Sequence, residues 1–448
     1  MTNLIGIGAS GISAYNTALA TIGDNVSNAQ TPGYARRSTV LQESPAASGT
    51  VGIYRDVAGA NGVSVAGVSR AWNDFQAQES RVASSDASAA DARMRWLTNA
   101  QSAVDSSDSG PGALVTAFFN AADSFAGNPG NDLSRSGMLS ALSDAADSIS
   151  GTAASLARVA SGIATEAGTT VSGLNGNLTA LANINQALSR TAPGTSAQAA
   201  LFDQRDQLLD NISAQIGIGA SFDANGAVTV TVAGSGTTLL SGGKISQLVL
   251  QQASDGRLAL SISAPDGTVQ PVGANGGSLA GLVDAAATVA SRRQQLNGIA
   301  TSFVAAINGW QANGVDANGN AGAPLLGISG GADTLQVLTT DPAAIAAAST
   351  DGTANGNLLA LQPLRSNGAE QQIAAMISQQ AQLVSSATAQ ATATATQRDN
   401  AFAARDTTSG VDLDQEAADL LRFQQAYQGS AKIIQAARDT FQSLLQSL

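Results

Sequence analysis

Apolar side chains recur every seven residues along residues 1–29, in two parallel rows. Two rows spaced three and four residues apart fall on one face of an α-helix, as in a coiled coil. The pattern therefore predicts an N-terminal helix with one apolar face, which we call the N-terminal seam. Its large members are Ile5, Ile12, Tyr15, Leu19, Ile22 and Val26, and Gly8 and Ala29 continue the rows.

A second heptad repeat closes the chain. Asp412, with Gln415 three residues later, resembles a capping box and predicts that a helix starts just after Gly410. We call the apolar positions of this helix the C-terminal seam. They are Leu413, Leu420, Phe423, Tyr427, Ile434, Phe441, Leu444 and Leu448.

Heptad helices at both chain ends admit two interpretations. They suit the core of a monomeric bundle, and they equally suit packing against other subunits. The charge pattern favours the second interpretation, because residues 1–35 carry one charged side chain, Asp24. A helix that faces water normally has a charged face, so we expect partners to enclose this one on several sides.

Residues 6–11 read GIGASG and match the G-x-G-x-x-G pattern of dinucleotide-binding loops. That loop follows a buried strand, and an acidic residue for the ribose is expected about 20 residues later. Only MTNLI precedes Gly6, and Thr31 occupies the position of the acid. We therefore expect no nucleotide here. The glycines of this helix, Gly6, Gly8, Gly11 and Gly23, are interpreted as sites of close helix packing.

The middle of the chain alternates between helical and strand patterns. Thr31-Pro32-Gly33 predicts a turn, after which the chain runs extended. Apolar segments at 51–57 and 63–69 around Asn61-Gly62 predict a β-hairpin. Helical periodicity runs from about 72 to 217, strand patterns follow from 218 to 272, and helices return at about 278–312 and 368–404. The predicted fold class is mainly α with β-rich parts.

Three short segments need a choice between readings. DANG at 223–226 predicts a hairpin turn. DANGN at 316–320 resembles the start of a calcium loop, but Ala321 and Gly327 stand at the sixth and twelfth positions, so a plain turn is favoured. ATATAT at 391–396 alternates like a strand, yet its helical neighbours favour a weak helix.

Composition narrows the chemistry. The 448 residues include no His and no Cys, which excludes a Ser-His-Asp triad, a thiolate nucleophile and an imidazole metal site. Nothing marks out a carboxylate pair, so we expect no catalytic residues, no metal and no cofactor. A net charge of −12 disfavours nucleic acid and anionic membranes as partners. No cleavable secretion signal or membrane-spanning run is recognisable, which by sequence rules alone suggests a cytoplasmic protein.

The segment DNVSNAQTPGYARR at 24–37 resembles the Asn-x-x-Asn-x-x-Thr-x-Gly-Tyr signature of flagellar axial proteins, the rod, hook and hook-associated subunits. Segments 61–75, 201–213, 313–322 and 409–445 are also similar to this family, the last three to hook-associated members at the hook-filament junction. The signature residues are Asn25, Asn28, Thr31, Pro32, Gly33 and Tyr34. The chain departs from longer relatives in lacking an additional outer domain between about 322 and 366.

The resemblance implies a nested layout of three domains. Residues 1–35 and 411–448 would form an inner coiled-coil domain, and residues 36–110 and 345–410 a second domain with the β-hairpin and long helices. Residues 111–344 would form an outer mixed α/β part, with its β-rich insertion near 218–272.

The resemblance also implies a non-enzymatic adaptor that joins hook to filament, and the alternative is another axial subunit, of hook, rod or flagellin-like type. Its partners would be copies of itself in a ring or helical assembly, the hook protein and a second junction protein. A flagellar export chaperone would guard the C-terminal seam. Export through the flagellar type III apparatus, without a cleaved signal, would place the protein outside the cell and override the cytoplasmic reading.

Overall fold

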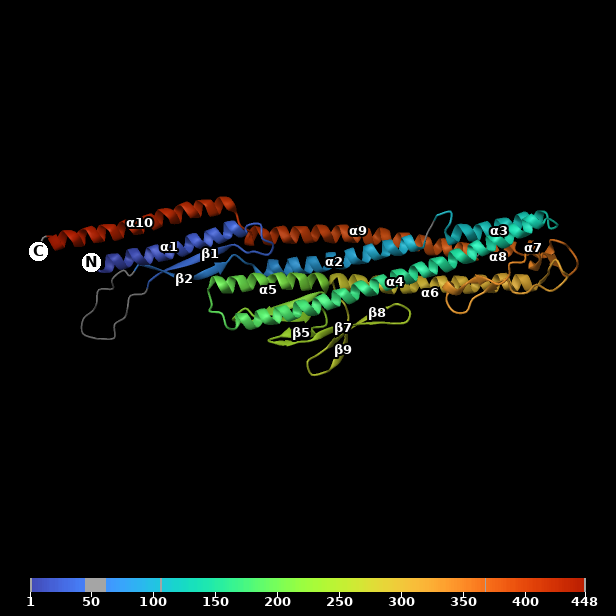
Figure 1. Ribbon diagram of the computed structural model, residues 1–448, viewed down its shortest axis with the longest axis horizontal. Helices are drawn as coiled ribbons and strands as arrows, with labels where there is room; N and C mark the ends of the chain where they lie inside the picture. The colour runs from blue at the N-terminus through green and yellow to red at the C-terminus, as the bar shows by residue number, and fades with distance from the viewer. Residues whose placement is uncertain (1, 45–61, 105–106, 367, 447–448) are drawn as a thin grey trace.

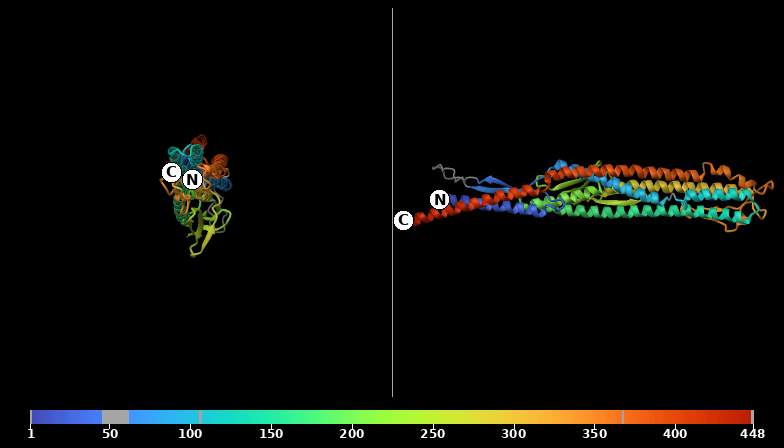
Figure 2. Two further views of the ribbon diagram at one scale, coloured as in Figure 1. Left: turned by 90° about the vertical axis from the view of Figure 1, so that its right-hand side faces the viewer. Right: turned by 90° about the horizontal axis from the view of Figure 1, so that it is seen from above.

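The computed structural model describes residues 2–44, 62–104, 107–366 and 368–446. The molecule is long and narrow, and the two chain ends lie together at one end of it (Figures 1 and 2). Long helices run along the molecule, and the larger β-sheets project from one side. The predicted fold class, mainly α with β-rich parts, is confirmed at this level.

The helices account for most of the described chain. Asparagine and threonine side chains cap several of their starts; the Asn131 side chain, for example, accepts hydrogen bonds from the backbone N–H groups of Leu133 and Ser134. The helices are α1 (Thr2–Asn28), α2 (Asp74–Ala103), α3 (Pro111–Gly127), α4 (Asp132–Leu188), α5 (Ser196–Gln215), α6 (Gly277–Ala312), α7 (Gly356–Leu359), α8 (Gln362–Arg365), α9 (Ala369–Ser409) and α10 (Leu413–Gln446).

Helices α2, α3, α4, α5, α6 and α9 form one bundle. Helix α2 packs against α9, α6 and α5, and α4 packs against α3, α6 and α5. The core contains fully buried side chains such as Phe118, Phe125 and Leu142. A glycine sets the closest approach of α2 and α6, because a Cβ atom at Gly281 would overlap the carbonyl oxygen of Ala89. The predicted helical stretches from 72 to 217, 278 to 312 and 368 to 404 are confirmed.

The β-rich insertion lies between α5 and α6, as predicted for 218–272. It forms an antiparallel four-stranded sheet in the order β3-β4-β5-β6 and a three-stranded sheet in the order β7-β8-β9. The turn at 223–226 is confirmed, with Gly226 at φ 81°. The strands are β3 (Ile218–Phe222), β4 (Val228–Val232), β5 (Thr238–Ser241), β6 (Lys244–Ile245), β7 (Gln247–Gln252), β8 (Leu258–Ser263) and β9 (Val269–Val272).

Residues 313–349 add two small two-stranded sheets and two short 3-10 helices. Here 316–320 forms the predicted turn, because the Asp316 carboxylate accepts hydrogen bonds from the backbone N–H groups of Asn318 and Asn320. The elements are β10 (Gly314–Val315), β11 (Leu326–Gly327), η1 (Ala332–Thr334), β12 (Gln336–Val337), η2 (Pro342–Ala344) and β13 (Ala348–Ser349). Residues 391–396 lie within α9, so the helical reading of ATATAT is also confirmed.

The strand predicted at 63–69 exists as β2 (Val63–Arg70), and it pairs antiparallel with β1 (Arg37–Glu43), a pairing that was not predicted. The segment 51–57 lies outside the described residues. The β1 segment was expected only to run extended, because its sequence, RSTVLQE, alternates weakly between apolar and polar positions.

The chain ends and the β1-β2 pair form a separate unit, which we call the terminal arm: α1, β1, β2 and α10. Within it, α1 packs against α10 and against both strands. Figure 1 shows α1 and α10 extending beyond the end of the bundle, and the view from above in Figure 2 agrees. The arm adjoins the bundle mainly where β2 meets α5.

Candidate assembly site

Helices α1 and α10 pack antiparallel over most of the length of α1. The ring of Tyr15 lies 6.1 Å from that of Phe423, centroid to centroid, in a tilted arrangement. A Cβ atom built on Gly8 would lie 2.5 Å from Cγ1 of Ile434, and one on Gly11 would lie 3.1 Å from Cβ of Ser430. Any larger residue at either glycine would force the two helices apart.

These contacts confirm the predicted close helix packing for two of the four glycines of α1. Gly8 and Gly11 allow close approach of α10, as predicted for the GIGASG segment. Gly6 and Gly23 face no atom of the described chain within 4 Å, so the close packing expected of them does not occur within one chain.

The contact face of α1 differs from the full N-terminal seam. Its buried positions are mostly small or polar. The heptad rows included Gly8 and Ile22 but not the other small positions, because small residues carry little hydrophobic signal. The buried positions are Gly8, Gly11, Ala14, Ala18, Thr21, Ile22 and Asn25. They could have been found by treating Gly8 and Gly11, rather than Ile5 and Ile12, as the contact row.

One row of the N-terminal seam, Tyr15 and Ile22, faces inward, and Ile22 is only 5% exposed. The other row lies to the side: Ile12 and Leu19 are half-buried, and Ile5 and Val26 are exposed.

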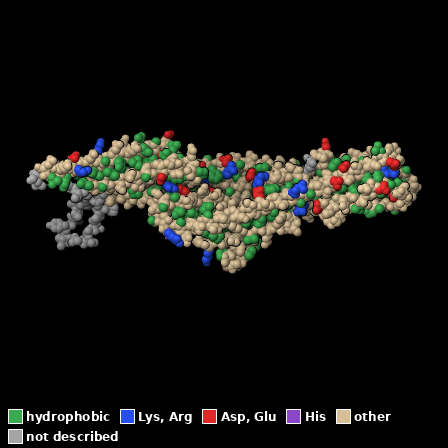
Figure 3. Space-filling model, in the orientation of Figure 1, with side chains coloured by type: hydrophobic (Ala, Val, Ile, Leu, Met, Phe, Trp, Pro, Cys, Tyr) green, Lys and Arg blue, Asp and Glu red, His purple; other side chains and the backbone are tan. Residues whose placement is uncertain are grey.

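The C-terminal seam divides in the same way. Leu420, Phe423 and Ile434 are half-buried, the last two against α1, whereas the remaining described members are exposed. Those exposed members are Leu413, Tyr427, Phe441 and Leu444, and Leu448 lies outside the described residues. Figure 3 shows hydrophobic side chains gathered over this end of the molecule. An apolar surface of this kind is typical of an interaction site.

The signature residues lie where the end of α1, the start of β1 and the start of α10 meet. Asn25 is fully buried, and its side-chain amide uses both N–H donors and both lone pairs of its oxygen. Its Nδ2 donates to the carbonyl of Arg37 at 2.8 Å and to Oε2 of Glu416 at 3.0 Å. Its Oδ1 accepts from the Tyr34 hydroxyl at 2.8 Å and from the backbone N–H of Arg37 at 3.0 Å. One asparagine thus joins the end of α1, the start of β1 and the start of α10.

Glu416 is the acidic centre of this junction. It is 1% exposed, and its Oε1 accepts a hydrogen bond from Nε of Arg36 at 2.6 Å. Arg36 also contacts Asp419, with 3.3 Å between Nη2 and Oδ2. We call Asn25, Tyr34, Arg36 and Glu416 the terminal clamp. Burial raises the pKa of the Tyr34 hydroxyl to about 12, so this donor stays protonated at neutral pH.

The rest of the signature builds the turn that leads into the clamp. The backbone N–H of Tyr34 donates to the carbonyl of Thr31 at 3.1 Å, which places Pro32 and Gly33 at the two central positions. Gly33 has φ 78°, as predicted for this turn. Asn28 accepts from the Thr31 hydroxyl at 3.3 Å and stabilises the end of α1.

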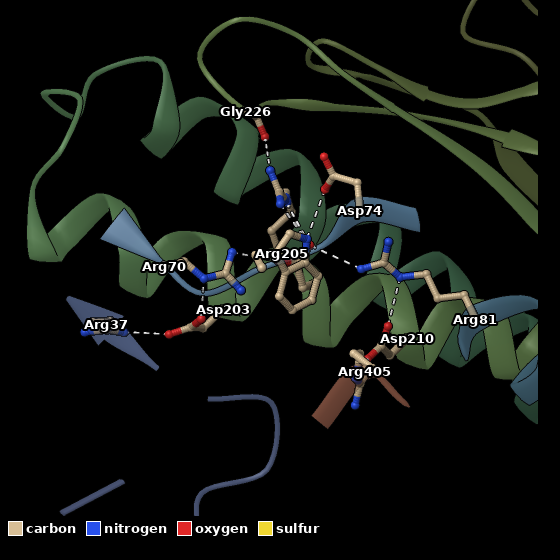
Figure 4. Close-up of polar contacts among 11 residues, drawn as sticks. Arg37, Arg70, Asp74, Arg81, Asp203, Arg205, Asp210, Gly226 and Arg405 are labelled. Atoms are coloured by element: carbon tan, nitrogen blue, oxygen red, sulfur yellow. Dashed lines mark hydrogen bonds and ion pairs between the residues drawn. The ribbon is translucent and has the colours of Figure 1, made fainter. Parts of the chain in front are cut away.

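A second polar cluster connects the arm to the bundle (Figure 4). Asp203, Asp206 and Asp210 lie along α5 at intervals of three and four residues, and therefore on one helix face. We call them the aspartate face. Five arginines reach it. Arg205 belongs to α5 itself, and the others come from different parts of the chain: Arg37, Arg70, Arg81 and Arg405.

The arginines are distributed in order along the aspartate face. Asp203 pairs with Arg37 at 2.6 Å and Arg70 at 2.9 Å, both from the arm. Asp210 pairs with Arg81 at 2.9 Å and Arg405 at 2.8 Å, both from bundle helices.

Asp206, between them, contacts Arg70 and Arg205 at 2.9 Å and Arg81 at 3.2 Å. Burial raises the pKa of the Asp203 carboxyl, and the charges of Arg70 and Arg37 oppose this rise. Sequence reasoning noted the segment LFDQRDQLLDNIS only as a resemblance, although its acidic spacing was a readable signal of one charged face.

Two findings bear on other classes of site. Among the described residues, no group of three or more His, Cys, Asp or Glu side chains could hold a metal ion. Within the same ranges, no helix is both long enough and apolar enough to cross a membrane.

The chain is similar to known flagellar proteins. Residues 97–326 match the family model described as flagellar hook-associated protein FlgK helical domain, and residues 406–447 match the flagellar basal body rod FlgEFG protein C-terminal model. Flagellar hook-associated protein 1 of Bacillus subtilis is 26% identical, over 94% of this chain and 94% of its own length. The protein of the same name from Escherichia coli is 26% identical over 79% of this chain and 65% of its own length.

A solved structure is also similar, the flagellar hook junction protein FlgK from Burkholderia pseudomallei. Its TM-score is 0.55 at 18% sequence identity, covering 61% of this chain and 66% of the other. This similarity concerns the fold.

Proposed function

The chain belongs to the flagellar hook-associated protein FlgK family, and from this we propose that it is a structural, non-enzymatic subunit of the bacterial flagellum that joins the hook to the filament. The observation that carries the proposal is the terminal arm. Its two helices cover one apolar row with each other, whereas the second row is only partly covered and its members Ile5 and Val26 are exposed. An adaptor subunit needs such a surface for contacts with identical and related neighbours.

We assign the inner position in the assembly to the helices of the arm, with residues 1–35 and 411–448 as a coiled-coil domain. Residues 36–110 and 345–410 would form the second domain, and residues 111–344 the outer part. The partners are further copies of this chain, the hook protein below and a second junction protein above. Both seams and the signature would take part in these contacts.

The alternative is another axial subunit, of rod, hook or flagellin-like type. The match to the FlgK helical domain over residues 97–326 favours the junction role, because only the shorter match at 406–447 is shared with rod and hook proteins. Complementation separates the two. Expression of this chain in cells that lack their own junction protein should restore filaments on existing hooks. Restoration of hooks in a hook-deficient strain, without junction activity, would support the alternative.

The terminal helices of the free subunit are expected to fold only on assembly. Residues 1–29 contain glycines at positions 6, 8, 11 and 23, each of which weakens an isolated helix by about 1 kcal/mol. Ordering the backbone costs on the order of 1–2 kcal/mol per residue, which the α1-α10 pair with its exposed row offsets only in part. Neighbouring subunits would supply the remaining burial.

Hydrogen exchange on the purified full-length chain tests this coupling of folding to assembly. Fast exchange across 5–29 and 413–445, beside a protected bundle, is the expected result. Strong protection of both terminal helices in dilute solution would contradict it.

Export through the flagellar type III apparatus would deliver the subunit to the outside of the cell without a cleaved signal. A cytosolic export chaperone would hold the C-terminal seam, since Leu420, Phe423, Tyr427 and Ile434 form an amphipathic stripe suited to a hydrophobic groove. The extracellular protein should keep its N-terminal sequence apart from removal of Met1. N-terminal sequencing that found a cleavage about 15–30 residues into the chain would refute this route.

A further inference from the structure

We propose that the aspartate face of α5 is a template. It holds on the bundle the segment that follows α1 and the segment that precedes α10, which we call the roots of the terminal helices, before those helices fold. It thereby sets the register in which α1 and α10 pair. The inference rests on the proposed folding of the arm during assembly. Asp203, Asp206 and Asp210 act in it as positioning residues, through the arginines they hold.

The two roots meet the same helix. Arg37 follows the turn that ends α1 and pairs with Asp203, and Arg405 lies in the last turns of α9, just before α10, and pairs with Asp210. Seven residues of α-helix separate the two aspartates, a rise of roughly 10 Å. Between the roots, the backbone N–H of Arg36 donates to the carbonyl of Ser409 at 2.8 Å. The chain leaving α1 and the chain entering α10 are therefore held side by side on the bundle.

The β1-β2 pair is fixed to α5 by contacts that do not involve α1 or α10. Arg70, at the end of β2, reaches Asp203 and Asp206 with a side chain that is 6% exposed. Its guanidinium lies 4.5 Å from the ring centroid of Trp72, which stiffens it further. The backbone N–H of Val68 donates to the carbonyl of Gly194, in the loop before α5, at 2.8 Å. These contacts can persist while the terminal helices are unfolded.

The apolar faces of α1 and α10 are repetitive, so contacts outside these faces are needed to fix the register in which they pair. Apolar residues recur every seven positions on both α1 and α10, so a slip of one heptad would still bring apolar side chains together. The contact row of α1 also includes Ala14 and Ala18, whose small side chains offer little shape to resist sliding. Only the correct register places Asn25 against Glu416. Roots held at fixed points on α5 favour that register before side-chain packing begins.

Hydrogen exchange on the free full-length chain gives the first test. In the wild-type chain, residues 37–43 and 63–70 should exchange slowly even if 5–29 and 413–445 exchange fast. Asp203→Asn removes the charge that pairs with Arg37 and one of the two charges that pair with Arg70. Exchange in 37–43 should therefore rise by about 10-fold or more, while α2 and α6 keep their protection. Asp203→Glu, which restores the charge, should recover part of the protection. Asp255→Asn, which breaks an exposed pair with Arg257, is the matched control and should change nothing in the arm.

Cross-linking in assembled flagella gives the second test, and it uses the absence of native cysteine. Tyr15→Cys with Phe423→Cys reports the correct register. Tyr15→Cys with Ile434→Cys reports a slip of one heptad, because Ile434 lies against Gly8, seven residues from Tyr15, in the correct register. The wild-type background should yield the first product only, and Asp203→Asn should add the second.

Fast exchange of 37–43 in the wild-type chain, or Asp203→Asn indistinguishable from Asp255→Asn in both tests, would overturn the template. Protected terminal helices in the free chain would instead refute coupled folding. The two failures are distinguishable, because the comparison of 37–43 between Asp203→Asn and Asp255→Asn does not depend on the state of α1 or α10.

Discussion

The terminal clamp predicts an unusual order of severity among three variants. Arg36→Met removes the cation from Glu416, which is 1% exposed and would keep only the Asn25 amide as a partner. Glu416→Gln removes the charge but keeps an oxygen acceptor. The double variant removes both charges and leaves an amide facing an amide. We expect Arg36→Met to be the most harmful of the three, and the double variant to recover part of the loss.

The structure sets the size of the effect. Removing one partner of a buried ion pair typically costs about 3–5 kcal/mol, because the remaining charge is left without compensation. The Arg36 side chain is 21% exposed, so water reaches the vacated position and the lower end, about 3 kcal/mol, applies. That corresponds to a decrease of about 100-fold in the equilibrium for closing the arm. In the double variant no buried charge remains, and we expect most of this decrease to disappear.

Complementation at graded expression measures the effect. Filaments are counted per cell in a strain lacking its own junction protein, and the amount of each variant exported to the medium is measured as the control. Arg36→Met should need a much higher level of exported subunit for the same filament count. Filament counts equal to wild type for Arg36→Met, or a double variant worse than Arg36→Met, would refute the clamp as the closing contact.

Three further predictions concern single positions. Gly281→Ala in α6 should lower the free energy of unfolding by about 1–3 kcal/mol, because its Cβ would press on the α2 backbone. Gly298→Ala in the same helix has no atom within 4 Å of its Cβ and should raise the free energy of unfolding by up to about 1 kcal/mol. Thermal unfolding that ranked the two variants the other way would contradict the packing of α2 on α6. Gly33→Val should impair assembly, because φ 78° is costly for a β-branched residue, and normal motility would indicate a tolerant loop. Burial raises the pKa of Tyr34 to about 12, so its contribution to stability is fully present below the ordinary tyrosine pKa of about 10 and is lost as pH rises through about 12. In the assembled protein an ultraviolet titration should show one late-titrating tyrosine that Tyr34→Phe removes, and an unchanged curve for that variant would contradict the burial.

The sequence by itself determined the elements that rest on local periodicity. Heptad spacing identified both terminal helices, strand alternation identified the 218–272 insertion, and glycine with proline identified the turn at Pro32-Gly33. Each of these patterns depends on residues close together in the sequence, because helix, strand and turn are selected by local dihedral preferences and by which face is apolar. The signature was likewise readable, although its residues could be grouped only by resemblance.

Tertiary structure alone decided which residues meet. The helix periodicity could not tell that Gly8 and Gly11 would contact α10 while Gly6 would not, because that depends on how α1 is rotated about its axis against a partner some 400 residues away in sequence. The pairing of β2 with β1 was likewise not predicted, because it joins segments that are not neighbours in the sequence. Asn25 with Glu416, and four of the five arginines with one face of α5, are also long-range contacts. Charged residues carry no periodic signal for their partners, and the energy that brings them together exists only once the bundle has placed them within reach.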